Sequence, residues 1–75
     1  MLTTYRMIND FLTAIETAYN IAQNKEIPYI ERRETVKQYY NKANNIYRKI
    51  YKDLAWSERR EAREPINDLK NYFRF

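Results

Sequence analysis

The stretch that decides the fold runs from residue 4 to residue 24 and has the sequence TYRMINDFLTAIETAYNIAQN. Apolar side chains recur in it at alternating spacings of three and four residues, which is the pattern of one helix face. The members of this first row are Tyr5, Ile8, Leu12, Ile15, Tyr19 and Ala22. A second apolar row lies beside it at seven-residue spacing and comprises Met7, Ala14 and Ile21. A helix that is apolar over so much of its circumference usually packs against two neighbours.

The segment after this helix repeats the pattern. Residues 25–28 interrupt the periodicity, and Pro28 suits a first helical position, where a missing N–H has no partner in any case. A second helix is then predicted over about 29–55, with one apolar stripe formed by Val36, Tyr40, Ala43, Tyr47, Ile50 and Leu54. Because the connection is short, the two helices should form an antiparallel hairpin.

The C-terminal part contains two further breaks. Ser57 follows Trp56 and is expected to cap a new helix, because its hydroxyl can accept a hydrogen bond from first-turn amides. A charged helix is predicted over about 58–64, and Pro65 should break or restart it. A last short helix is predicted over about 66–73 from the spacing of Ile66, Leu69 and Phe73.

The composition supports an all-α fold. The chain has 75 residues and contains no glycine, no cysteine and no histidine. Tight hairpins and phosphate-cradling loops lack the glycine that they need. Disulfides and structural zinc sites lack their ligands, so we expect neither a metal nor another cofactor. We therefore predict one domain over residues 1–75, a two-helix hairpin with one or two short C-terminal helices in a small helical bundle.

The residue types argue against catalysis. Ser57 is the one candidate among the Ser, Cys and His groups that nucleophilic and acid–base catalysis usually recruit, and the cap explains it better. Carboxylates alternate with arginines in the charged segment and are expected to form exposed ion pairs: Glu58, Glu61 and Glu64 with Arg59, Arg60 and Arg63. We predict that the protein is not an enzyme.

Positive charge is concentrated on the second predicted helix. Residues 1–35 carry four basic and five acidic groups, whereas residues 36–56 carry five basic groups and one acidic group. At about 100° per residue, one flank of this helix collects cations and amides that can contact phosphates and base edges. The flank comprises Lys37, Asn41, Asn44, Arg48 and Lys52, with Tyr40 and Tyr51 at its border. The alternative is that the flank is only the solvated face that every amphipathic helix needs.

Eight tyrosines are the second unusual feature, because tyrosine is enriched at protein interfaces. Three of them lie on apolar stripes and are expected in the core: Tyr19, Tyr40 and Tyr47. Trp56 is expected to plug the core at a helix junction. Candidates for a protein interface are Met7, Ala14, Ile21, Tyr39, Tyr72 and Phe73, with Tyr29 and Tyr51 as further interface tyrosines. Because Met7, Ala14 and Ile21 extend the apolar surface of the first helix, we expect self-association as a dimer through this row.

Three functions remain, and protein binding ranks first. We expect a small regulator or inhibitor that contacts a protein partner through a basic, tyrosine-rich surface. Binding of RNA or single-stranded nucleic acid by the basic flank is the alternative, and an accessory subunit that completes a partner's helical bundle is the third. Residues 2–8 are too polar for a signal-peptide core or a membrane span, so a cytoplasmic location is the default. The small size and the richness in lysine, asparagine and tyrosine suit a phage or mobile element.

Overall fold

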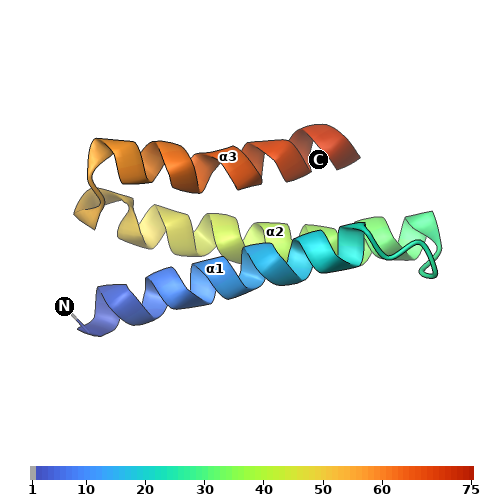
Figure 1. Cartoon of the computed structure of the whole chain (residues 1–75), viewed down its shortest axis with the longest axis horizontal. Coiled ribbons are helices and arrows are strands. Elements are labelled where there is room, and N and C mark those ends of the chain that lie inside the picture. The colour runs from blue at the N-terminus through green and yellow to red at the C-terminus, as the bar shows by residue number, and fades with distance from the viewer. Residues whose placement is uncertain (1) are drawn as a thin grey trace.

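Three α-helices form the fold, which confirms the all-α prediction. The computed structural model describes residues 2–75, and the side chains of residues 5–75. The elements are α1 (Leu2–Ala22), α2 (Tyr29–Ile50), the short 3-10 helix η1 (Tyr51–Asp53) and α3 (Trp56–Phe73). Figure 1 shows that α2 runs antiparallel to both α1 and α3, so that α1 and α3 point the same way. Residues 2–75 contain no strand, and no helix among them is long and apolar enough to cross a membrane.

The connection between α1 and α2 is a tight turn, as predicted. The side-chain oxygen of Asn24 accepts a hydrogen bond from the Glu26 amide at 3.1 Å, and the Asn24 carbonyl accepts one from the Ile27 amide at 3.2 Å. Pro28 directly precedes α2 as its N-cap, one position before the predicted one, with an extended backbone. Its carbonyl accepts the first helical hydrogen bond, from the Arg32 amide at 2.8 Å. This turn is what folds α2 back along α1.

The prediction that Pro65 ends a helix is wrong, because α3 continues through it from Trp56 to Phe73. The ring removes one amide from the helical ladder, at a cost of about 3 kcal/mol in an ordinary helix interior. Burial of Ile66, Leu69 and Phe73 on one face of α3 offsets that cost. A local breaker signal was therefore overridden by tertiary packing.

The start of α3 also differs from the prediction. The helix begins at Trp56, so Ser57 lies inside its first turn and is not the cap. Glu58 takes over part of that role, because its carboxylate accepts a hydrogen bond from the Ala55 amide at 2.7 Å. The carboxylate satisfies an amide at the helix start and complements the positive end of the helix dipole. Glu58 therefore has a structural task and is not simply one half of an exposed ion pair.

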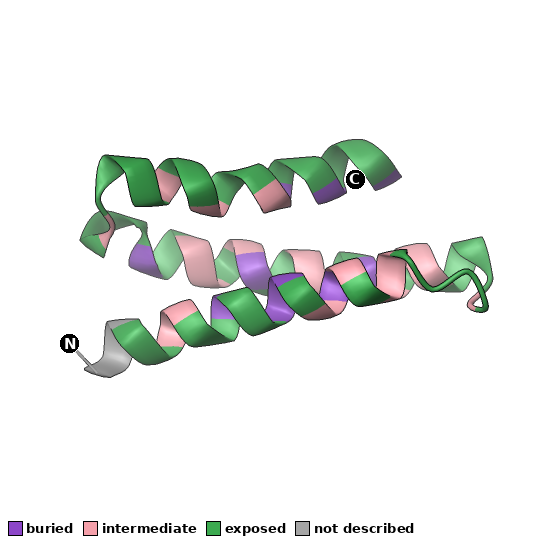
Figure 2. Ribbon diagram, in the orientation of Figure 1, coloured by how far each residue is buried: buried purple, intermediate pink, exposed green. Residues whose placement is uncertain are grey.

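Buried apolar side chains line all three helices, and the buried segments are purple in Figure 2. They are Phe11, Ala14, Ile15, Ala18, Val36, Ala43, Ile50, Ile66, Leu69 and Phe73. The alanines remove side-chain bulk where α1 and α2 meet, which allows the two helices to pack closely. Tyr19, Tyr40 and Tyr47 pack against this core while remaining half-buried, close to the prediction.

The two apolar rows of α1 meet different neighbours from those expected. In the first row, which was expected to face the core, Tyr5 is 77% and Leu12 57% exposed. In the second row, which was expected at a dimer interface, Ala14 is buried and Met7 lies over the seam with α2 beside Ile46. Helical spacing identifies both faces but contains no information about which neighbour each face meets. The prediction of the α1 core face was therefore wrong in part.

Candidate functional site

The predicted basic flank is an exposed surface of α2 and η1. Its members Lys37, Asn41, Arg48 and Lys52 are exposed, and Asn44 is half-buried. Lys52 lies in η1, because α2 ends at Ile50. The flank thus continues beyond the end of α2 towards the start of α3. Asn41 also lines a hollow at the seam with α1, so the flank reaches from that seam to the start of α3.

Beside this flank, a groove of about 560 Å³ separates the end of α2 and η1 from the first half of α3. It combines aromatic rings with guanidinium groups. The lining residues are Tyr47, Tyr51, Trp56, Arg59, Arg60, Arg63, Glu64 and Asn67. Of these, only Tyr51 belonged to the predicted binding set. The groove therefore extends the predicted surface onto a third element, α3.

Arg59 builds the floor of the groove. Its Nε donates a hydrogen bond to the Leu54 carbonyl at 3.1 Å, and its Nη2 donates to the Lys52 carbonyl at 3.4 Å. The same guanidinium lies 5.4 Å from the centre of the Tyr51 ring. A cation at this distance from an aromatic face is attracted by it. Arg59 therefore ties η1 to α3 and holds the Tyr51 ring at the groove.

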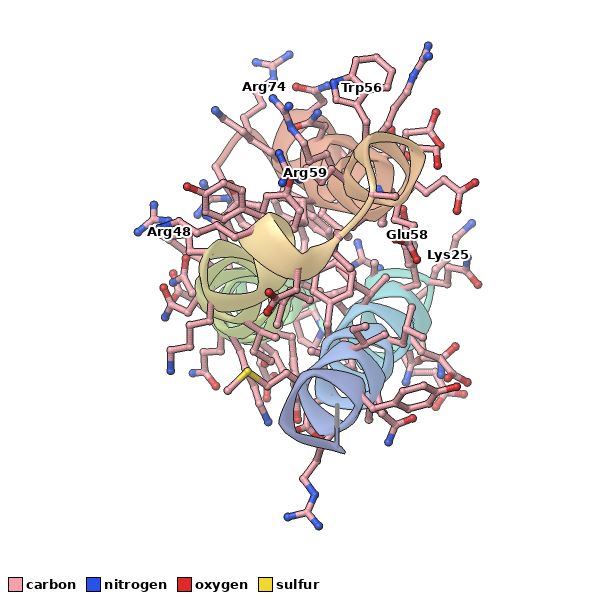
Figure 3. The ribbon with its side chains drawn as sticks, turned by 90° about the vertical axis from the view of Figure 1, so that its left-hand side faces the viewer. Lys25, Arg48, Trp56, Glu58, Arg59 and Arg74 are labelled. Atoms are coloured by element: carbon pink, nitrogen blue, oxygen red, sulfur yellow. The ribbon has the colours of Figure 1, made fainter. Side chains whose placement is uncertain are left out.

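Trp56 lies at the rim of the groove and is 75% exposed, so the prediction that it plugs the core is wrong. It begins α3, and its position ten residues before Ile66 places it about 80° from that core residue around the helix. Its indole therefore points away from the core and into solvent (Figure 3). The Arg60 guanidinium lies 6.0 Å from the indole centre. An exposed indole beside a cation is a surface suited to a flat, negatively charged ligand.

Most charges on α3 are separated by sign. At about 100° per residue, Arg59, Arg63 and Lys70 fall on the flank towards α2, and Glu58, Glu61 and Asp68 fall on the other flank. Arg60 and Glu64 lie on the outer face between the two flanks, and both line the groove. Figure 3 shows Arg48 and Arg59 on the side where α2 and α3 meet, and Glu58 on the side of α3 that faces α1. The sequence prediction treated the arginines and glutamates as ion pairs and divided this segment at Pro65, so it missed the separation. A helical wheel that places Arg59, Arg63 and Lys70 on one continuous helix shows it.

The candidate interface residues have different environments. Ala14 and Phe73 are buried in the core of this chain and present almost no surface. Met7, Ile21 and Tyr39 are half-buried, and the last two pack against the core. Tyr72 is exposed, and its ring makes an edge contact with Phe73 at 4.7 Å. Of this set, Tyr72 therefore offers the most free surface to a partner.

Among the described residues, no group of three or more acidic side chains is placed to hold a metal ion, and no polar or charged residue of 5–75 is buried. No family model, no curated protein and no solved structure matches the chain.

Proposed function

We propose that the protein binds single-stranded nucleic acid, RNA or DNA, through one basic aromatic surface. This surface is defined by cations of α2 and η1, cations of α3 and the rings between them: Lys37, Arg48, Lys52, Arg60, Arg63, Tyr51 and Trp56. The observation that carries the proposal is the exposed Trp56 indole, with the Arg60 guanidinium beside it at the rim of an arginine-lined groove. No catalytic step is part of this function.

The chemistry of the surface matches that of an unpaired strand. Lysine and arginine attract phosphates and release condensed counterions, which supplies affinity without sequence preference. Each base that stacks on an aromatic ring adds about 1–3 kcal/mol of binding free energy, and stacking requires bases that are not already paired. Trp56 and Tyr51 are ring platforms for this contact, since both are exposed and line the same groove.

The second candidate is an acidic protein partner, the function that ranks first from the sequence. The same cations would attract carboxylates, and tyrosine is common at interfaces. An exposed indole beside arginines also suits a protein hot spot, so the ligand itself has to distinguish the two candidates. A regulator or inhibitor could use either ligand, so the two candidates differ in the ligand and not in the surface.

A binding panel tests the proposal with the full chain. Fluorescein-labelled oligouridylate, the same length of oligo-deoxythymidylate and an RNA duplex are titrated with protein at about 0.1 M salt and followed by anisotropy. Both single strands should bind more tightly than the duplex, and polyglutamate should be a poor competitor. Tighter binding of the duplex, or complete displacement by an equal charge concentration of polyglutamate, would exclude a stacking surface for single strands.

Replacing Trp56 provides the matched test of the ring itself. Trp56→Leu keeps an apolar side chain at an exposed position and should weaken binding of oligouridylate by about fivefold or more, because stacking is lost. Tyr5→Leu is the control, since Tyr5 is equally exposed but lies on α1 and outside this surface. Equal effects of the two substitutions would contradict a specific role of Trp56.

A further inference from the structure

On the side of α3 opposite the basic aromatic surface, α1 and α3 leave a second groove between them. Two hollows follow each other along this seam. The first, of about 370 Å³, is lined by Ile8, Leu12 and Ile15 of α1 and by Ala62 and Pro65 of α3. The second, of about 690 Å³, continues with Tyr19 and Ala22 of α1 and with Leu69 and Tyr72 of α3. We call the two hollows together the α1–α3 groove.

The walls of this groove are apolar and incompletely covered. Leu12 on one wall is 57% exposed, and Tyr72 at the far end is 67% exposed. Tyr5 continues the Leu12 row by one seven-residue step towards the start of α1 and is exposed as well. A hydrogen bond between the Tyr19 hydroxyl and the Asp68 carboxylate joins the two helices in the second hollow. Contacts between α1 and α3 therefore shape the groove, and its apolar lining is exposed to solvent.

The rim of the first hollow is acidic. Glu58 and Glu61 line it from α3, and exposed Glu16 follows Leu12 by one turn on α1. Cations enter the lining only in the second hollow, as Lys25 and Arg32. An occupant of the first hollow therefore needs an apolar centre with positive charge on its flanks.

We propose that the α1–α3 groove binds an amphipathic α-helix of a partner protein, with lysine or arginine flanking its apolar stripe. A helix laid along two parallel helices packs its ridges into their grooves and completes a four-helix arrangement. A second copy of this chain fits less well. Its own exposed α1 row is flanked by Glu16, which would meet Glu58 and Glu61 as a like charge. This inference is independent of nucleic-acid binding, because it uses the opposite face of α3.

Two designed peptides test the charge of the occupant. Each is a fluorescein-labelled amphipathic helix of about 18 residues, which is five turns. The two share one leucine stripe, and the flanking positions are lysine in one and glutamate in the other. Anisotropy titration of the full chain at about 0.1 M salt should show the lysine peptide binding at least about tenfold more tightly. Equal affinity of the two peptides, or no binding of either, overturns the proposal.

Substitutions locate the site. Leu12→Lys should weaken binding of the lysine peptide by about tenfold or more, whereas Thr13→Lys should leave it unchanged, because Thr13 is exposed on α1 but does not line the groove. Glu61→Lys should remove most of the preference for the lysine peptide. Equal effects of the first two substitutions overturn the site, and circular dichroism confirms that each variant is folded.

Sedimentation distinguishes a second copy of this chain from a partner helix as the occupant of the groove. Without peptide, the unmodified chain and the Leu12→Lys variant should have the same molecular mass in sedimentation. A dimer that Leu12→Lys converts to a monomer would show that a second copy fills the groove and would overturn the partner helix.

Discussion

The two arginines on the α3 wall of the basic aromatic surface allow a sharp quantitative prediction. Arg60 and Arg63 are exposed and line the groove, and Arg59 is left intact because it anchors η1 through two backbone carbonyls. The double variant Arg60→Ala/Arg63→Ala lowers the net charge from +4 to +2. If both side chains contact phosphates, the slope of log affinity against log salt should fall in magnitude by about 1.4, at about 0.7 for each contact with a single strand.

The matched control is Lys42→Ala/Lys49→Ala, which causes the same change in net charge. Both lysines are exposed on α2 and line the hollow at the seam with α1, which is lined by none of the residues that define the basic aromatic surface. Oligouridylate affinity is measured by anisotropy between about 0.05 and 0.2 M salt, a fourfold range over which a slope difference of 1.4 amounts to about sevenfold in affinity. The control should retain a slope close to that of the unmodified protein.

The result that refutes this reasoning is an equal change of slope in the two double variants. It would mean that net charge alone sets binding and that the separation of charges on α3 has no functional part. Circular dichroism of both variants checks folding, because exposed substitutions usually change stability by no more than about 0.5 kcal/mol.

Three further predictions concern the fold. Leu69→Ala should lower the free energy of unfolding by about 2–5 kcal/mol in urea denaturation, because Leu69 is buried between the helices; a loss below about 1 kcal/mol would contradict its place in the core. Pro65→Ala should raise the melting temperature, since it restores an amide to α3 and is worth up to about 3 kcal/mol; an unchanged or lower melting temperature would show that the ring is needed in the α1–α3 groove. Burial, the Asp68 charge and the hydrogen bond to Asp68 raise the pKa of Tyr19 above its ordinary value of 10.0. The stability that neutral Tyr19 contributes is therefore present below pH 10.0 and is lost as the pH rises through the higher pKa of the folded state. The unmodified protein should therefore lose more stability than Tyr19→Phe between about pH 8 and pH 11, and parallel losses would exclude this linkage.

The sequence predicts the helices well because their signals are local. Spacings of three and four residues marked α1 and α2, and Pro28 marked the turn between them within one residue. Pro65 misled because a breaker signal is also local, whereas burial of Ile66 and Leu69 on one face of α3 depends on the other helices. Whether a helix continues through a proline depends on contacts between helices, and the spacing of apolar residues in the sequence does not report those contacts.

The candidate site was predicted only in part for the same reason. The α2 flank with Lys37 and Arg48 follows from one helix and was found, but its extension onto α3 requires knowing that α3 lies beside it. Trp56 was placed in the core because it lies at a helix junction, and only its position around α3 shows that it points outwards. Leu12 and Ala14 were likewise assigned to faces without knowledge of their neighbours.

The most direct measurement of nucleic-acid binding uses Trp56 as its own probe, because it is the only tryptophan in the chain. Oligouridylate is added to the 75-residue chain while tryptophan emission is followed, and the anisotropy of a labelled strand is recorded in parallel. Stacking of a base on the exposed indole should quench the emission along the same binding curve as the anisotropy. Binding by anisotropy with unchanged tryptophan emission, or no binding at all, would contradict the proposed surface.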